Sequence, residues 1–358
     1  MPNIFQDEFY RVTRLVNEEI ERFFDQKLAS TKKTDRHIHA MVEVLKEYSL
    51  RGGKHIRPFL TWCGYRVAGG KEEGKIIRAA AGVGLLHFYI LNLDDMADRD
   101  TLRHGGPTLE EYYKTALTNI PQKHRDHYGR SFSEIAGALL NTYAYELVRT
   151  SGFDPKDILE ALGILNKEMF EDTAAGWLIH MHQNWQNVAD ATEEEFIKGL
   201  NLVTAQYTFV GPLLIGATLA GTGKKYFPAL REFGLHVGTA FQIQDDILGL
   251  FGDKTVTGKA VGNDLREGKK TLLIQYAYRH GNSHEREVVE RALGGSVDEK
   301  TLIQVQQIVQ KTGGLEHGKK LAKGYVEKGI EIIKTSLPDK QTQEILFELA
   351  QFIIERKY

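Results

Sequence analysis

The chain has 358 residues, of which 42% are hydrophobic and 26% are charged, a composition typical of a folded globular protein. The formal net charge of −2 excludes the broad basic surface that binds nucleic acid, so we expect no nucleic-acid partner. The single cysteine, Cys63, excludes an intramolecular disulfide and is typical of a reducing compartment, which predicts a cytoplasmic protein. The first residues lack the basic and apolar regions of a signal peptide, and no apolar run reaches the roughly 18 residues of a membrane span, so we expect no stable membrane insertion.

Helical periodicity runs through the chain. Apolar residues at three- and four-residue spacing predict a helix over about 5–29. The same pattern predicts helices over about 37–50, 58–67, 76–93, 109–117, 131–151, 156–180, 192–221, 227–251, 270–280, 284–294, 298–313, 315–336 and 339–356. Alternation typical of strands is not convincing anywhere, and the most irregular stretches are 99–108 and 252–269. We find no linker and no repeat of fixed period, which predicts one all-α domain spanning 1–358.

An acidic cluster ends the most apolar of these helices. Asp94 and Asp98 are four residues apart, so a helix places them on one face with Asp95 beside them. Carboxylates this close repel one another unless a positive charge lies between them. Taken alone, the cluster fits either a solvated helix end or a site for a hard divalent cation such as magnesium.

A second acidic cluster, Asp245 and Asp246, ends another helix and leads into an irregular loop. Taken alone, this pair fits a helix cap or an exposed turn. Three basic groups accompany the two clusters, and they lie within residues 52–58, 103–107 and 257–271. The last group has the composition of a phosphate loop but lacks the spacing of a Walker A sequence. Cations that bridge both carboxylate clusters to a diphosphate, with Lys and Arg on its other oxygens, would account for all these groups together.

Four motifs carry a resemblance to a known family. They are GGKHIRP at 52–58, DDMADRDTLRHGGPT at 94–108, FQIQDDILGLFGD at 241–253 and VTGKAVGNDLREGKKT at 256–271. In this order they resemble the trans-isoprenyl diphosphate synthase (polyprenyl synthetase) family, over nearly the whole chain from about residue 40. The resemblance implies an all-α, isoprenoid synthase-type helical bundle around a deep central cavity, usually as a homodimer. It also implies magnesium-dependent, head-to-tail condensation of an allylic diphosphate with isopentenyl diphosphate.

The resemblance assigns roles to particular residues. Asp94, Asp98 and Asp245 would bind the metal, while Asp95 and Asp246 would orient metal-bound water or neighbouring groups. Thr204 and Gln242 would line the cationic reaction centre. The allylic diphosphate would be held by Arg103, Lys259 and Lys269, and isopentenyl diphosphate by Lys54, Arg57, His87 and His104.

The sequence departs from the family pattern at four positions. Gly249 stands where the second cluster usually has its last Asp, and His104 stands in place of an Arg. Val203 replaces a Lys before Thr204, and a Gln common in the family is replaced near Trp177. These departures motivate an alternative reading, a weakly active or regulatory subunit of a heteromeric prenyl synthase.

The resemblance also bears on product length. The growing chain would run beside the helix that carries Asp94, where Tyr89 and Ile90 precede the cluster by about one turn. This pattern is similar to geranylgeranyl diphosphate synthases, with farnesyl diphosphate as the next candidate product, although Phe88 and Tyr89 could be core aromatics. A class I terpene cyclase is a further alternative, because it shares an Asp-rich cluster. Retention of the residues assigned to isopentenyl diphosphate argues against a cyclase, which needs no second diphosphate site.

Overall fold

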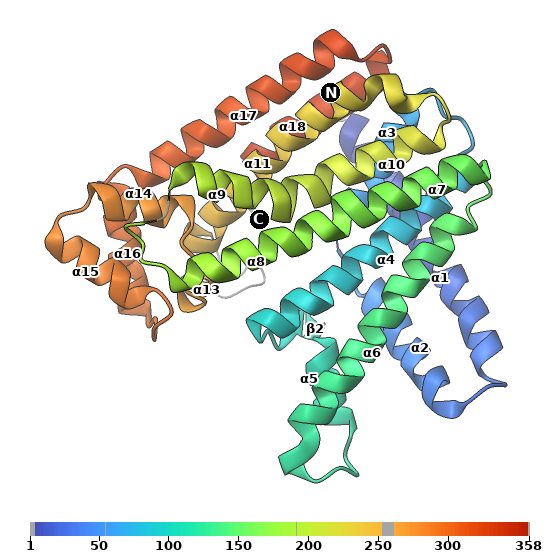
Figure 1. Ribbon diagram of the computed structural model, residues 1–358, viewed down its shortest axis with the longest axis horizontal. Coiled ribbons are helices and arrows are strands. Elements are labelled where there is room, and N and C mark those ends of the chain that lie inside the picture. Colours follow the sequence, from blue (N-terminus) through green and yellow to red (C-terminus); the bar gives the residue numbers. More distant parts are fainter. Residues whose placement is uncertain (1–3, 54, 191, 253–260, 357–358) are drawn as a thin grey trace. The chain divides into compact units, whose positions relative to one another are not determined.

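The computed structural model describes residues 4–53, 55–190, 192–252 and 261–356, and within them helices form nearly all the regular structure (Figure 1). The elements are α1 (Ile4–Thr31), α2 (Arg36–Leu50), α3 (Ile56–Val67), α4 (Glu73–Asp98), β1 (Leu102–Arg103), β2 (Gly106–Pro107), α5 (Leu109–Ala116), α6 (Gln122–Arg149), α7 (Pro155–Ile164), the π-helix η1 (Leu165–Glu171), α8 (Asp172–Trp185), α9 (Glu193–Leu200), the π-helix η2 (Asn201–Val210), α10 (Gly211–Leu219), the 3₁₀-helix η3 (Gly223–Tyr226), α11 (Phe227–Phe251), α13 (Asn263–Arg266), α14 (Leu272–His280), α15 (Ser283–Ala292), α16 (Glu299–Lys311), α17 (Gly314–Ser336) and α18 (Lys340–Glu355).

Capping side chains explain why several helices begin where they do. Asp35, Thr108 and Asn282 accept hydrogen bonds from backbone N–H groups in the first turns of α2, α5 and α15. Thr192 and Glu195 form a reciprocal capping box at the start of α9. Each such cap contributes about 1 kcal/mol. The starts that apolar spacing predicts for these four helices lie within one residue of the observed ones.

The chain divides into two compact units, and the first contains Gln6–Gly163 and Ile215–Gly223. Its central helix is α4, which packs along α6 and against α3. At the crossing with α6 the buried Asn92 amide donates to the Ser133 carbonyl at 3.1 Å, and the Ser133 hydroxyl donates back to Asn92 at 2.8 Å. Gly82 keeps the crossing close, since a Cβ there would lie 2.7 Å from the Ala144 carbonyl oxygen. The first acidic cluster therefore ends a helix that is fixed by its packing.

The second unit contains Asn3–Phe5, Ile164–Leu214 and Lys224–Tyr358. Its central helix is α11, which packs along α17 and against η2. Gly238 allows the close approach to η2, because a Cβ there would lie 2.6 Å from the Cα of Ala205. On its other side η2 packs against α8, where Gly176 leaves room for Val203. The second acidic cluster thus ends a helix with neighbours on several sides. The prediction of one domain over 1–358 remains a prediction.

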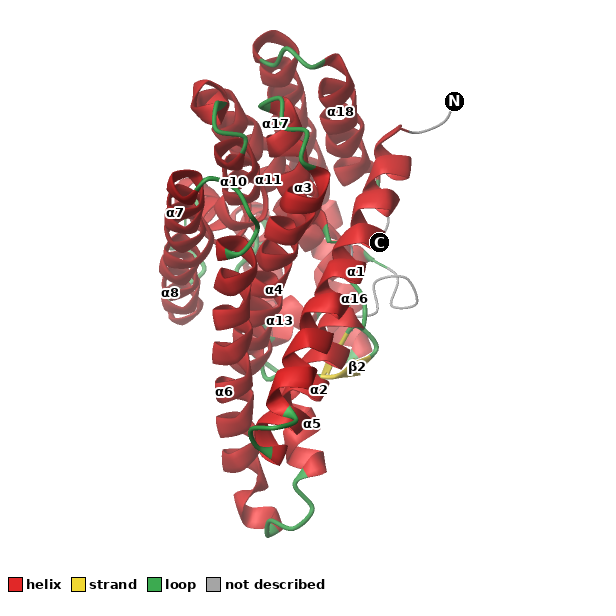
Figure 2. Ribbon diagram, turned by 90° about the vertical axis from the view of Figure 1, so that its right-hand side faces the viewer, coloured by secondary structure: helices red, strands yellow, loops and turns green. Residues whose placement is uncertain are grey.

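Two local features differ from the sequence prediction. Helix α6 begins at Gln122, well before the predicted start at 131, because its first turns are polar and mostly exposed and carry no apolar periodicity. These turns pack against α5, with Gly129 close to Lys114. A hairpin joins α4 to α5, drawn in yellow in Figure 2, in which Leu102 pairs with Pro107 and Arg103 with Gly106. Strands of two residues are too short to show alternation in a sequence.

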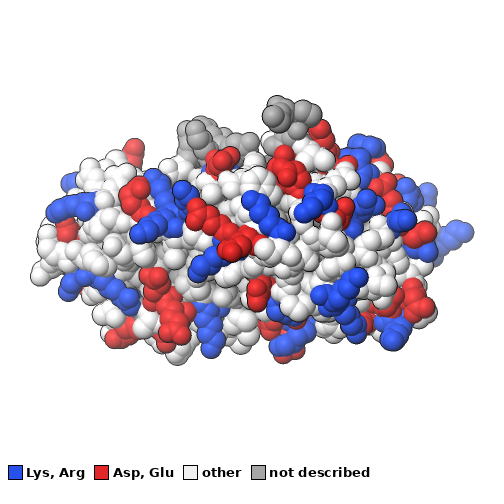
Figure 3. Space-filling model, turned by 90° about the horizontal axis from the view of Figure 1, so that it is seen from above, with Lys and Arg blue, Asp and Glu red and all other residues white. Residues whose placement is uncertain are grey.

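Two helical stretches, Glu73–Asp98 and Glu193–Leu219, are long and apolar enough to cross a membrane. They are longer than the apolar runs of the sequence because partly polar turns continue the helices. Of their most apolar windows, 72% and 83% are buried, which is typical of the core helices of a folded unit. On the face drawn in Figure 3, basic and acidic side chains are interspersed, and no continuous basic area lies on that face.

Candidate active site

The first acidic cluster acquires a cation from the hairpin that follows it. Arg99 ends α4 in the left-handed conformation, and His104 and Gly105 are left-handed at the tip of the hairpin, as a type I′ turn requires. Arg103 lies in β1, directly before this turn. As a result the guanidinium of Arg103 donates from Nε to Asp95 at 2.6 Å, and it lies 3.5 Å from Asp94 and 3.3 Å from Asp100.

The three carboxylates of this cluster have different surroundings. Asp95 is buried, and it accepts a hydrogen bond from the Tyr48 hydroxyl at 3.3 Å in addition to those from Arg103. Burial raises the pKa of Asp95 to about 6, although Arg103 acts in the opposite direction. Burial alone would lower the pKa of Arg103, but the hydrogen bond to Asp95 and the charges of Asp95 and Asp94 together outweigh burial and raise that pKa. Asp95 therefore positions Arg103, whereas Asp94 and Asp98 are partly exposed.

The structure brings together two of the residues assigned to isopentenyl diphosphate. A guanidinium nitrogen of Arg57 lies 3.1 Å from Nε2 of His87. Because Arg57 can only donate, Nε2 must accept, so His87 is the neutral tautomer protonated on Nδ1. Burial and the Arg57 cation hold the pKa of His87 well below its usual value, which agrees with that tautomer. His104, also assigned to isopentenyl diphosphate, lies close to the glycine pair that precedes α3, since a Cβ on Gly53 would be 3.8 Å from the His104 ring. Lys54 lies outside the described residues.

The residues assigned to chain length occupy different environments on α4. Phe88 is fully buried and meets the rings of Tyr48 and His55 edge to face, as a core aromatic does. Ile90 is also buried. Tyr89 is only partly buried, and a Cβ on Gly137 of α6 would lie 3.3 Å from its ring. Tyr89 is thus the member of the three with part of its surface exposed.

The second acidic cluster is neutralised from a distant part of the chain. The guanidinium of Arg356, just after α18, pairs with Asp245 and donates to the Phe241 carbonyl at 2.9 Å. It also lies over the Phe241 ring, 4.0 Å from the centroid. Sequence reasoning missed Arg356, because no motif surrounds it. Its one sequence signal is an Arg that follows the apolar positions of the last helix.

Asp246 is held by a chain of hydrogen bonds from η2. The Thr204 hydroxyl donates to the Gln242 side-chain oxygen at 2.7 Å, and the Gln242 amide donates to Oδ1 of Asp246 at 3.0 Å. The wider turn of a π-helix often accompanies functional positions, and it carries Thr204 here. The preceding residue, Val203, fills the space beside Gly176. The position that holds a Lys in the family pattern therefore serves packing in this chain.

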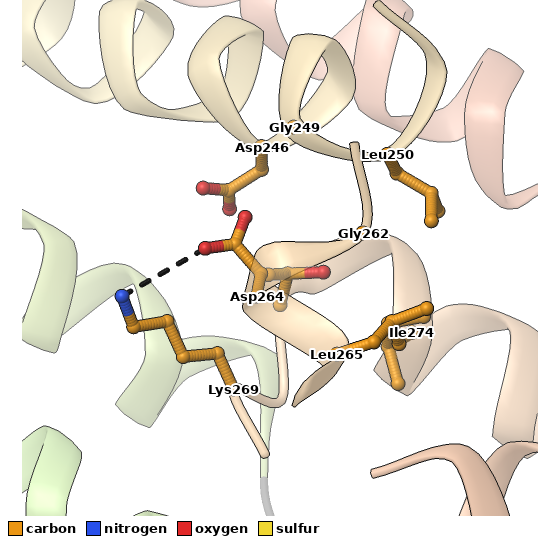
Figure 4. A pocket seen from close by; sticks show the side chains of 9 residues that line it. Asp246, Gly249, Leu250, Gly262, Asp264, Leu265, Lys269 and Ile274 are labelled. Atoms are coloured by element: carbon orange, nitrogen blue, oxygen red, sulfur yellow. Dashed lines mark ion pairs between the residues drawn. The ribbon is translucent and has the colours of Figure 1, made fainter. Parts of the chain in front are cut away.

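The second carboxylate oxygen of Asp246, Oδ2, has different surroundings from Oδ1. Asp246 is 6% exposed, and its Oδ2 is buried without a hydrogen-bond partner among the described residues. Burial and the nearby carboxylates of Asp264 and Asp245 raise its pKa well above the usual range, although Gln242 opposes them. Asp246 lines a small cavity together with Asp264 and Lys269 (Figure 4).

The two lysines at the end of the basic loop have separate roles, which the sequence cannot distinguish. Lys270 is buried, and its Nζ donates to the carbonyls of Gln183 and Asn184 at 2.8 Å each, which caps the C-terminus of α8. Lys269 reaches the cavity instead, 3.7 Å from Asp264, and also pairs with Glu267. Lys269 is therefore the lysine of the pair that lines the cavity. Lys259 lies outside the described residues.

The donor set suits magnesium bound together with phosphate. Within the described residues no three His, Cys, Asp or Glu side chains are already grouped as a metal cage. Magnesium in phosphate-binding sites commonly uses only one or two carboxylates, with water and phosphate oxygens completing its shell. Asp94 and Asp98 at the end of α4, and Asp245 near the end of α11, are partly exposed carboxylates of the kind that such a metal uses. The residues present therefore fit the metal.

Comparisons with known proteins agree with one another. Residues 39–312 match a family model described as polyprenyl synthetase. The chain is 32% identical to a geranylfarnesyl diphosphate synthase of Aeropyrum pernix, over 85% of this chain and 91% of that one. It is 28% identical to a geranylgeranyl diphosphate synthase of Saccharolobus solfataricus, over 98% and 97% of the two chains. A crystal structure of geranylgeranyl pyrophosphate synthase from Corynebacterium glutamicum, complexed with isoprenyl diphosphate and magnesium, is similar with a TM-score of 0.90 at 25% identity, over 97% of this chain and 99% of that one.

Proposed function

The chain belongs to the polyprenyl synthetase family, and we propose that it condenses an allylic diphosphate with isopentenyl diphosphate, head to tail, to a short-chain prenyl diphosphate. In this reaction the allylic carbon–oxygen bond breaks and diphosphate leaves. The double bond of isopentenyl diphosphate then attacks the allylic cation, and the product loses one proton. The protein must therefore stabilise a leaving diphosphate, bind a second diphosphate and shield a cation from water.

The acidic clusters and their neighbours serve the first task. Magnesium, when bound, supplies the charge that offsets the departing diphosphate. Asp94, Asp98 and Asp245 are its proposed protein ligands, and Asp95 holds Arg103 where its guanidinium neutralises neighbouring carboxylates. Lys269 offers a further cation for phosphate oxygens.

The observation that carries the proposal is the contact between Arg57 and His87. Arg57 follows the glycine-rich loop and directly precedes Pro58 in α3, so its guanidinium donors are fixed in place for a phosphate group. His87 restricts the orientation of that guanidinium through the 3.1 Å contact. A terpene cyclase, which uses one diphosphate, needs no such second group.

The reaction centre needs polar groups that do not react with a carbocation. Thr204 and Gln242 meet this need, because their oxygens present partial negative charge and the hydrogen bond between them fixes both. No protein base has been assigned to the final proton, and the departing diphosphate is the proposed acceptor.

The test is direct. Purified protein is incubated with isopentenyl diphosphate, magnesium and an allylic diphosphate of five, ten or fifteen carbons, and the products are identified by mass spectrometry. We expect a longer allylic diphosphate that disappears when magnesium is chelated. Absence of condensation with every allylic substrate would favour the regulatory-subunit alternative, and a hydrocarbon made without isopentenyl diphosphate would favour a cyclase.

We propose geranylgeranyl diphosphate as the main product, with farnesyl diphosphate as the next candidate. Tyr89 is the proposed floor of the product cavity, and Tyr89→Ala should lengthen the product by at least one five-carbon unit. A matched control is Tyr145→Ala, which removes another partly buried tyrosine in the same unit. An unchanged product length in Tyr89→Ala would show that Tyr89 only packs against α6.

We propose that the chain forms a homodimer. Leu178, Met181 and Trp185 lie on one face of α8 and are 69%, 56% and 91% exposed, a stripe that a second copy could cover. Leu178→Glu should convert a dimer to a monomer in sedimentation experiments. A monomeric wild-type protein that pairs only with an active homologue would support a heteromer instead. A cytoplasmic location stays a prediction.

A further inference from the structure

A neighbouring carboxylate fills the space next to Gly249. If Gly249 carried a Cβ, that atom would lie 2.7 Å from Oδ2 of Asp264. Real Cβ atoms essentially never approach an oxygen this closely, so any other residue at 249 would force the Asp264 carboxylate to shift from this position. The backbone holds the two residues together, because the N–H of Gly262 donates to the Gly249 carbonyl at 2.9 Å. Gly249 is the position at which the acidic motif of α11 lacks its last Asp.

The carboxylates of Asp246 and Asp264 are not fully balanced by the described cation beside them. Asp264 faces Asp246 across the cavity, below Gly249 (Figure 4). Oδ2 of Asp246 is buried and has no hydrogen-bond partner among the described residues. The described cation on the cavity wall is Lys269, whose Nζ is 3.7 Å from Asp264, too long for a hydrogen bond. Asp246 is buried and Asp264 is partly exposed, and a buried carboxylate that faces a second carboxylate is costly unless a cation lies between them.

We propose that Asp264 supplies the third carboxylate of the second acidic cluster, in the space that Gly249 leaves open, and binds a divalent cation together with Asp245 and Asp246. The inference rests on the proposed function, because it assigns the cation to a metal–diphosphate site. It implies that the loss of an acidic residue at 249 is compensated within this chain, so the second cluster retains three carboxylates.

A structural role for Asp264 is the competing explanation. Asp264 lies in the first turn of the short helix α13, and its carbonyl accepts from the N–H of Lys269 at 2.8 Å. A backbone contact does not depend on the carboxylate, however, and an Asp in that turn does not need Gly249 beside it. Moving the carboxylate from position 264 to position 249 therefore distinguishes a metal-binding role of Asp264 from a structural one.

The experiment measures binding of Mn²⁺ to the full chain in the presence of inorganic diphosphate, from the electron paramagnetic resonance signal of free Mn²⁺. Asp264→Ala should weaken binding at one site about tenfold, as loss of a metal-site carboxylate does. The double variant Gly249→Asp/Asp264→Ala moves the carboxylate to position 249 and removes the atoms with which it would collide. We expect it to restore binding close to that of the wild type.

Two further variants keep the test decisive. Asp264→Asn preserves the shape of the side chain and covers the case in which Asp264→Ala does not fold. Asp298→Asn is the matched control, because it also removes one carboxylate in this unit while the new Asn still caps α16, and binding should not change. Unchanged Mn²⁺ affinity in both Asp264 variants, or no restoration in the double variant, would overturn the proposal.

The outcome is separable from that of the proposed function. Mn²⁺ binding does not require turnover. Condensation by the wild type together with unchanged binding in the Asp264 variants would reject only the present inference. Weakened binding in those variants, with no condensation by the wild type, would reject the proposed reaction and retain the third carboxylate.

Discussion

Each acidic helix end contains a buried carboxylate, and the two units surround that carboxylate with different groups. In the first unit, buried Asp95 receives a cation from Arg103, only eight residues further along the chain, and a hydroxyl from Tyr48. In the second unit, buried Asp246 receives one amide, and Arg356, which lies 111 residues from Asp245, pairs with its neighbour instead. In the first cluster the buried carboxylate is therefore balanced by an Arg of its own unit close in sequence, while the second cluster depends on a distant Arg and leaves one buried oxygen without a partner among the described residues.

From this difference in charge balance we expect some substitutions to lower the stability of the protein and others to weaken metal binding. Removal of a charge from a balanced cluster leaves its partner buried and unpaired, which costs several kcal/mol. Removal of a charge from an unbalanced cluster relieves repulsion in the absence of metal. Substitutions in the two units should thus change stability in opposite directions, although both units serve one proposed reaction.

The largest effect is expected at Asp94. This carboxylate is 33% exposed, so Asp94→Ala should leave the fold intact while it lowers the condensation rate about a thousandfold, as loss of a transition-state electrostatic contact can. The rate is measured by product formation and the fold by circular dichroism. Asp126→Ala, at a side chain that is 90% exposed in the same unit, is the matched control. Retained turnover in Asp94→Ala would refute the role of the first cluster.

The next effect tests the internal balance of the first cluster. Arg103→Gln should lower the free energy of unfolding by about 3 kcal/mol, because buried Asp95 would lose its cation. Chemical denaturation measures the change. Arg130→Gln removes an exposed Arg that pairs with Glu134 and should change stability by less than about 1 kcal/mol. Equal effects in the two variants would mean that Arg103 does not balance the cluster.

The stability of the protein should depend on pH, and His55 of the first unit is one cause. Burial, with a smaller contribution from His104, lowers the pKa of His55 to about 4. The unfolded chain, with a pKa near 6.5, therefore binds the proton more readily, and stability should fall by up to about 3 kcal/mol as the pH drops from about 6.5 to 4. His55→Asn should flatten this loss, since Asn tolerates the φ of 41° at that position.

The control for this pH dependence is His104→Asn. His104 has a similar left-handed backbone, with φ of 51°, but its side chain is exposed. That substitution removes only the smaller contribution of His104 to the lowered pKa of His55, so it should reduce the pH dependence of unfolding less than His55→Asn does. If both variants flatten it equally, burial of His55 is not its cause.

The smallest effect is expected at Asp246, and its sign is opposite to that at Arg103. Asp246→Asn should raise the free energy of unfolding without metal by about 1 kcal/mol, because it removes a buried carboxyl group whose ionisation burial and Asp264 disfavour and whose Oδ2 has no partner among the described residues. Denaturation in the presence of a chelator measures it, with Asp298→Asn as the reference. A loss of stability would mean that the groups around Asp246 stabilise its carboxylate, as Arg103 stabilises Asp95 in the first cluster.

Local signals account for most of what the sequence could predict. Apolar spacing gave the helices, and the family resemblance singled out Arg57, His87, Thr204 and Gln242, although the contacts among them come from the structure. Contacts that depend on tertiary packing were out of reach. The pairing of Arg356 with Asp245, and the space that Gly249 gives Asp264, need the folded backbone to become visible.

The contact between Arg57 and His87 has a practical consequence for spectroscopy. Since Arg57 donates to Nε2, the imidazole nitrogen keeps a lone pair that a ¹⁵N chemical shift can distinguish from a protonated nitrogen. An anion that draws the guanidinium away would alter this shift without involving either aspartate cluster. His87 thereby provides an internal reporter for occupancy of one diphosphate subsite, readable in the intact protein before any bond is made or broken.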